Sequence, residues 1–144
     1  NTRDAFCSLD SLNKDTYEAN YLRLIAEIDS TEAILDTLLC PFAGTAFIIY
    51  HPALTYLARD YGLEQLCIEM DGKEPSPAQL KALVEAAKRH NAKVVFVQQE
   101  FDQKNAKIIA RETGCILVPI NPLDYNWPES MLTIGKALAS WKKN

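Results

Sequence analysis

The feature that most constrains the fold of this chain is a repeated alternation of short apolar runs and amphipathic segments from residue 46 onward. Each apolar run has the length of one strand, and its nearly continuous hydrophobicity is typical of strands that are covered on both faces. A repeated order of strand, helix and strand predicts parallel strands joined by right-handed crossovers. We expect strands at 46–50, 66–69, 93–97 and 115–120, and helices at 52–60, 77–90, 103–113 and 128–141.

A long helix is predicted before the first strand. Apolar residues recur at helical spacing over 16–39, and Pro41 and Gly44 end the pattern. The predicted fold class is therefore α/β: a three-layer sandwich around a four-stranded parallel sheet, preceded by a long connecting helix. We assign residues 1–43 to a helical segment that includes this helix, and residues 44–144 to a carboxyl-terminal α/β lobe.

Composition and charge exclude several classes of function. The formal net charge is -4, and basic residues do not cluster outside the carboxyl-terminal tail, so a nucleic-acid partner is not expected. No run approaches the roughly 20 apolar residues of a membrane-spanning helix. None of the four cysteines stands in a C-x-x-C pair, which disfavours a thioredoxin motif or a zinc ribbon. The sequence leaves open whether any of them form a disulfide.

Polar side chains follow the predicted strands. The carboxyl ends of parallel strands share one edge of the sheet, and ligands bind at that edge in open α/β folds. The first strand ends in His51, and a neutral imidazole with several oxygen ligands suits zinc or manganese. The oxygen-bearing residues at the other strand ends are Glu69, Asp71, Gln98, Gln99, Glu100, Asn121 and Asp124.

Most of these residues can also be interpreted as structural or solvated residues, and the sequence does not distinguish this role from metal binding. A histidine at a strand end, such as His51, can be a hydrogen-bonded structural residue. We interpret Glu69, Asp71 and Asp124 as solvated loop charges, and Glu100 is compatible with a simple loop position before the next helix.

No motif of an enzyme is recognisable. The chain has no glycine-rich phosphate loop and no G-x-S-x-G motif. Cys67 and Cys115 fall within predicted strands, so their thiols are expected to lie away from His51, which argues against a Cys–His nucleophile. His90 ends a predicted helix, where a positive charge is favourable. We therefore expect a binding function rather than catalysis.

Three segments carry a family resemblance. Residues 47–63 read F-I-I-Y-H-P-A-L-T-Y-L-A-R-D-Y-G-L, residues 72–77 read G-K-E-P-S-P, and residues 121–123 read N-P-L. Together they resemble the metal-binding solute receptors of bacterial ABC importers for zinc and manganese, and the resemblance extends over essentially the whole chain. It implies a sheet in which the four strands lie in the order second, first, third, fourth.

The resemblance also implies a place for this chain in a larger receptor. Receptors of this family have two α/β lobes joined by one long helix, with the metal between the lobes. The chain resembles the connecting helix and the carboxyl-terminal lobe, so its implied partners are an amino-terminal lobe, which supplies two histidines, and the ABC permease. The implied location is the periplasm or the outer face of the cytoplasmic membrane. An isolated lobe is expected to expose the face that met its partner lobe and to be able to dimerise.

Family matching assigns metal-ligand roles to particular residues. His51 matches the third histidine ligand, and Asn121 falls where the family usually has an aspartate ligand. Gln98 falls where a glutamate is usual, and Glu100, two residues on, is the candidate to replace it. We expect zinc in preference to manganese, weakly held or absent in this chain alone. The alternative, motivated by the amides at 98 and 121, is an adhesion or protein-interaction module with a degenerate metal site.

Overall fold

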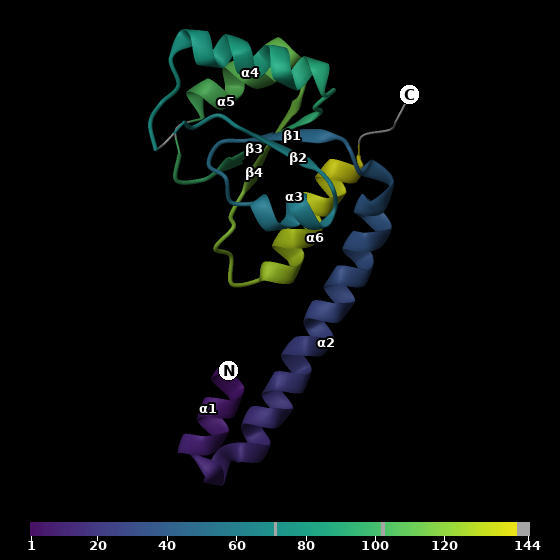
Figure 1. Cartoon of the computed structure of the whole chain (residues 1–144), viewed down its shortest axis with the longest axis vertical. Helices are drawn as coiled ribbons and strands as arrows, with labels where there is room; N and C mark the ends of the chain where they lie inside the picture. The colour runs from purple at the N-terminus through teal and green to yellow at the C-terminus, as the bar shows by residue number, and fades with distance from the viewer. Residues whose placement is uncertain (71, 102, 141–144) are drawn as a thin grey trace.

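The computed structural model describes residues 1–70, 72–101 and 103–140. A compact α/β lobe lies at one end of the molecule, and a long helix extends from it toward the amino-terminal end of the chain (Figure 1). This helix, α2 (Lys14–Leu39), is preceded by α1 (Thr2–Leu9) and the short helix η1 (Ser11–Asn13), and a second short helix, η2 (Cys40–Phe42), follows it.

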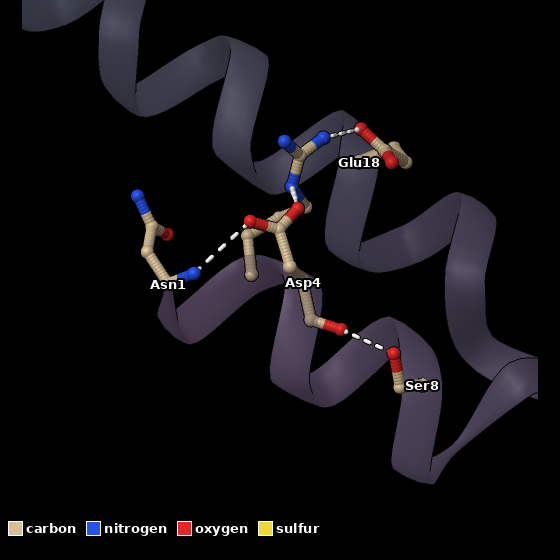
Figure 2. Close-up of polar contacts among 5 residues, drawn as sticks. Asn1, Asp4, Ser8 and Glu18 are labelled. Atoms are coloured by element: carbon tan, nitrogen blue, oxygen red, sulfur yellow. Dashed lines mark hydrogen bonds and ion pairs between the residues drawn. The ribbon is translucent and has the colours of Figure 1, made fainter.

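Helix α1 folds back along the first turns of α2 and forms a small hairpin with it. Figure 2 shows Glu18 of α2 facing Asp4 of α1. Arg3 joins the two carboxylates: its Nη1 lies 2.6 Å from Glu18 Oε2, and its Nε lies 2.8 Å from Asp4 Oδ1. Phe6 and Tyr17 stack across the same hairpin, with ring centroids 5.4 Å apart. The hairpin therefore combines an ion-pair network with aromatic contacts, which include Arg3 over the Tyr21 ring.

The sheet has the predicted topology. Its strands are β1 (Ala46–Ile49), β2 (Glu64–Cys67), β3 (Val94–Gln98) and β4 (Ile116–Ile120), all neighbouring pairs are parallel, and the order is β2-β1-β3-β4. This order confirms the one that the resemblance implied.

Three strands match the predicted bounds to within one residue, whereas β2 begins and ends two residues earlier than expected. It is an edge strand, and Glu64 at its start is exposed. An edge strand needs an apolar side chain only where it meets the core, so its polar start carries no apolar signal.

Besides the end of α2, the helices that cover the sheet are α3 (Thr55–Asp60), α4 (Pro77–Arg89), α5 (Lys104–Thr113) and α6 (Trp127–Ala139). They match the predicted helices to within one residue except at two ends. The predicted helix from residue 52 begins at Thr55, because the Ala53 N–H bonds the carbonyl oxygen of His51 at 2.7 Å and turns the chain first. The predicted end of the last helix at residue 141 lies outside the described residues.

Two apolar layers pack on opposite faces of the sheet, which confirms the three-layer sandwich. One layer joins α2, α3 and α6 to the sheet, and the other joins α4 and α5 to it, as Figure 1 shows. The first layer contains Leu35, Leu39, Phe47, Ile49, Phe96 and Ile134 among others, and the second contains Ile48, Tyr50, Val95, Val97 and Ile109 among others. Alternate residues of the central strands β1 and β3 therefore enter alternate layers.

The carboxyl-terminal part of α2 belongs to the core of the lobe. Its buried residues are Thr31, Leu35 and Leu39, all in its second half. Leu35 lies against Gly135 of α6 so closely that a Cβ at this glycine would come within 2.6 Å of a Leu35 methyl carbon. The helix is thus anchored to the lobe at one end, while Leu22 and Leu24 in its first half are exposed. In the described part of the chain, no helix combines the length and the apolar character that crossing a membrane requires.

The burial of Phe96 predicts that truncating this side chain causes a large loss of stability. This side chain is fully buried on β3 and packs edge-on against Phe47, with ring centroids 5.7 Å apart. We expect Phe96→Ala to lower the free energy of unfolding by about 3–5 kcal/mol, measured by urea denaturation, because it leaves a cavity in the central layer. The control is Tyr125→Ala, at a fully exposed side chain, with an expected change within about 0.5 kcal/mol. Equal losses at the two positions would contradict this placement of the core.

Candidate metal-binding edge of the sheet

His51 lies at the carboxyl edge of the sheet, as predicted. It comes two residues after Ile49, the last residue of β1, which pairs with Cys67 of β2 and with Phe96 of β3. Continuing both registers by two residues places His51 level with Glu69 on one side and with Gln98 on the other. The His51 side chain is 49% exposed, so the imidazole is accessible from solvent.

Glu69 contacts the imidazole directly. Its Oε2 lies 2.9 Å from His51 Nδ1, and its side chain is only 13% exposed. The interpretation of Glu69 as a solvated loop charge was therefore wrong. This contact could not be predicted from the sequence, because a carboxylate after an edge strand resembles any loop charge until the register of β2 against β1 is known.

Gln98 holds the backbone of His51 from the other side. Its amide is almost completely buried; Nε2 donates to the His51 carbonyl oxygen at 2.8 Å, and Oε1 accepts the His51 N–H at 3.3 Å. The resemblance placed Gln98 where the family usually has a glutamate. In this structure its two amide atoms satisfy a backbone donor and a backbone acceptor, which a carboxylate cannot do because it only accepts.

Phe101 covers one face of the imidazole. Its ring stacks on His51 with centroids 5.7 Å apart, and on Tyr50 with centroids 4.8 Å apart. A tight turn brings it there, because the Phe101 N–H donates to the Gln98 carbonyl oxygen at 3.2 Å. Glu100 lies in this turn and is exposed. It follows Gln98 by two residues and so lies near the same edge of the sheet as His51.

Asn121 lies farther along the same edge. Ile120 is level with Gln98 in the register of β3 and β4, so Asn121 is two strands away from His51, roughly 10 Å at the usual strand spacing. Asn121 Oδ1 accepts the Leu123 N–H at 3.2 Å and stabilises the turn after β4. It also lines a shallow open pocket with Gln99, Pro119, Ile120, Asp124, Asn126, Glu129, Ser130 and Thr133.

The predicted ligands are thus not gathered into one cluster by this chain. Among the residues that the structure describes, no group of three or more His, Cys, Asp or Glu side chains is arranged to hold a metal ion. Asp71, another candidate, lies outside the described residues. His90 is at the opposite end of the sheet, where its Nδ1 pairs with Glu64 at the start of β2. The metal-ligand roles of His51, Glu100 and Asn121 remain predictions.

Two of the cysteines lie in the sheet region: Cys67 is the last residue of β2, and Cys115 directly precedes β4. All four are free thiols. Burial raises the pKa of the Cys67 thiol, with the nearby Glu69 carboxylate adding to the effect, and burial also raises the pKa of the Cys115 thiol. Cys115 Sγ lies 3.1 Å from the Ala92 carbonyl oxygen, at the amino-terminal edge of the sheet. Protonated thiols are poor nucleophiles, so neither Cys67 nor Cys115 is suited to act as one.

Comparison with known proteins identifies one family. The sequence model described as "Zinc-uptake complex component A periplasmic" matches residues 1–138. The high-affinity zinc uptake system protein ZnuA of Bacillus subtilis is 34% identical over 114 residues, which are 78% of this chain and 36% of that protein. The zinc-binding lipoprotein AdcA of Streptococcus pneumoniae is 30% identical over 77% of this chain and 23% of its own length.

Solved structures agree with this assignment. A crystal structure of ZnuA superimposes with a TM-score of 0.90 at 34% identity, over 96% of this chain and 55% of that one. The laminin-binding protein of Streptococcus agalactiae, described as bifunctional with adhesin and metal-transporting activity, gives a TM-score of 0.82 at 26% identity, over 94% of this chain and 58% of that one. The chain thus spans about a third or less of these curated relatives, and just over half of these solved structures.

The two hydrogen bonds of Gln98 predict that a negative charge at this position destabilises the protein. We expect Gln98→Glu to lower the free energy of unfolding at neutral pH by roughly 1–3 kcal/mol, because a buried carboxylate would face the His51 carbonyl oxygen without a proton to donate. The matched control is Gln99→Glu, the same change at the exposed neighbour, which should leave stability nearly unchanged. Urea denaturation measures both, and a fully stable Gln98→Glu variant would rule out the two-bond contact.

Proposed function

This chain belongs to the family of the periplasmic component A of zinc-uptake complexes, and we propose that it forms one side of a site that captures a divalent metal for an ABC importer. Zinc is the proposed ion, in preference to manganese, because both curated relatives described above are named for zinc. The observation that carries the proposal is His51, a half-exposed imidazole at a strand end with one ring nitrogen already engaged. Its other nitrogen, Nε2, can then bind a metal.

The proposed site is incomplete within this chain. Tight zinc sites use three or four protein ligands, and this edge offers one imidazole with amide and carboxylate oxygens at a distance. We propose that a second, amino-terminal α/β lobe supplies the remaining ligands, and that residues 1–43 include the helix connecting it to the lobe of residues 44–144. A metal held between two lobes is bound tightly while they are together. It is released to the permease when they separate, because each lobe alone binds it weakly.

The proposed location follows from the same family. Relatives are named as a periplasmic component and as a lipoprotein, so we place this protein in the bacterial cell envelope, in the periplasm or at the outer face of the cytoplasmic membrane. The family is one of transport components, and the proposed function makes and breaks no covalent bond. Dimerisation of the lobe through the face that would meet its partner remains a prediction.

Adhesion is the second candidate function. It is favoured by the similarity to a laminin-binding protein. It is also favoured by the neutral amide of Asn121, at a position where the family resemblance implies an aspartate. The two functions differ in what they require of the metal site. Adhesion tolerates a site that has lost affinity, whereas import requires one that works with the residues present.

Replacing the Asn121 amide by a carboxylate distinguishes adhesion from metal import. If the metal site is in use, Asn121→Asp should change zinc affinity less than about tenfold, or ~1.4 kcal/mol, because the Asn121 side-chain oxygen already has a structural partner in the Leu123 N–H. Asn126→Asp, the same change at an exposed position of the same loop, controls for net charge. Zinc titration by calorimetry measures both, and a gain of several tens of fold at 121 alone would favour a site that has drifted from metal binding.

The histidines provide the direct test of zinc binding. The chain has two, and only His51 is at the proposed site. We expect this chain to bind Zn²⁺ weakly, His51→Ala to abolish the binding, and His90→Ala to leave it unchanged, in a competition titration with a chromophoric chelator. Binding that survives His51→Ala, or that is lost in His90→Ala, would refute the proposed function.

A further inference from the structure

We propose that Glu69 is a positioning residue that holds the proton of the His51 imidazole on Nδ1 and so makes Nε2 the metal-binding atom. This inference deepens the proposed function and rests on it. It assigns a role to a residue that lies on β2's side of the edge, outside the segments that carry the family resemblance.

Geometry is the first support. Glu69 Oε2 lies 2.9 Å from His51 Nδ1, the distance of a charge-assisted hydrogen bond. The backbone holds Glu69 in place, because its N–H donates to the Tyr50 carbonyl oxygen at 3.0 Å, next to His51. Just beyond Glu69, Met70 and Lys73 exchange backbone hydrogen bonds of 3.1 and 3.0 Å, which fold the chain back after the strand. The carboxylate is therefore presented by ordered backbone rather than by a free loop.

The surroundings restrict the imidazole from three sides. Glu69 holds Nδ1, Phe101 stacks on one ring face, and Gln98 holds the His51 backbone through both of its amide atoms. These contacts come from the ends of β2 and β3, the two neighbours of β1. The ring is thus constrained in position and in rotation, while 49% of the side chain stays exposed. A metal ligand fixed in this way needs little further ordering when the metal arrives.

Hydrogen-bond chemistry then decides the tautomer. An ionised carboxylate only accepts hydrogen bonds, so Nδ1 must carry a proton to bond with it. In a neutral imidazole the other nitrogen, Nε2, then has the free lone pair that binds metal. A carboxylate behind a ligating histidine also raises the basicity of the metal-binding nitrogen, and loss of such a partner typically costs about 10–100-fold in metal affinity.

Direct ligation by Glu69 is the competing role. Its Oε2 is engaged by Nδ1, and its side chain is only 13% exposed, so ligation would require it to leave this bond and turn outward. The two roles differ in what a neutral isostere does. Glutamine keeps an oxygen that accepts the Nδ1 proton, but it is a much weaker metal ligand than a carboxylate.

Nuclear magnetic resonance of the full chain separates the roles, because with two histidines each imidazole can be followed by itself. Long-range ¹H–¹⁵N spectra of the metal-free protein, in mildly alkaline solution, report which ring nitrogen carries the proton. We expect the Nδ1–H form at His51 in the wild type and in Glu69→Gln. In Glu69→Ala we expect a shift toward the Nε2–H form that free imidazole side chains prefer.

The chain contains its own matched control. His90 Nδ1 also pairs with a carboxylate, that of Glu64, at the opposite end of the sheet. Glu64→Ala should therefore leave the His51 tautomer unchanged, and Glu69→Ala should leave His90 unchanged. The backbone amide spectrum verifies that each variant is folded. If Glu69→Ala does not fold, the isosteric Glu69→Gln still reports the His51 tautomer and the zinc affinity.

Zinc titration, followed at the His51 ring signals, completes the test. We expect affinity for Zn²⁺ to fall roughly 10–100-fold in Glu69→Ala and distinctly less in Glu69→Gln. The proposal is overturned if the wild type lacks the Nδ1–H form, or if Glu69→Ala retains it. It is also overturned if Glu69→Gln loses as much affinity as Glu69→Ala with the tautomer intact, which would make Glu69 a ligand. Failure of the proposed function looks different: Zn²⁺ would leave the His51 signals of the wild type unmoved, while the tautomer measured without metal still decides the role of Glu69.

Discussion

The pairing of β1 with both of its neighbours is the interaction on which the rest of the structure depends. β1 is central, completely buried and only Ala46–Ile49 long, yet it contributes alternate side chains to both apolar layers. The same two registers bring Glu69 and Gln98 to either side of His51. Because side chains alternate between faces along a strand, a slip of one residue would exchange the layers and separate these three residues together. Stability and the candidate site therefore share one constraint.

The candidate metal site is incomplete within this chain and resembles one side of an interface. Its histidine is ordered by contacts from neighbouring strands but remains half exposed, and the oxygen-bearing residues predicted to join it lie at a distance. Two polar side chains next to His51 hold it in place. Gln98 bonds its backbone, and Glu69 contacts its ring. Such an edge orders one metal ligand and requires a second surface to supply the others. The relatives are longer than this chain and have room for such a surface.

Much of the fold could be predicted from the sequence because its signals are local. Apolar runs located β1, β3 and β4, and helical periodicity located α2. Errors arose where a longer-range contact overrides the local pattern. β2 shifted toward polar residues because it is an edge strand, and α3 began late because a turn at His51 precedes it. The long helix read as a connector is also a core element, since Leu35 meets Gly135 of α6, a contact that periodicity cannot reveal.

By itself the sequence determined the fold class, the strand order through family resemblance, and the position of His51 at a strand end, because each is encoded in contiguous residues. Only the tertiary structure decided which side chains surround that histidine. Glu69 is 18 residues from it along the chain and Gln98 is 47, and neither belongs to a local motif with it. Their contacts follow from the register between strands, which depends on packing in the whole sheet. Elements are therefore readable from local periodicity, whereas the partners of a site residue are set by long-range pairing.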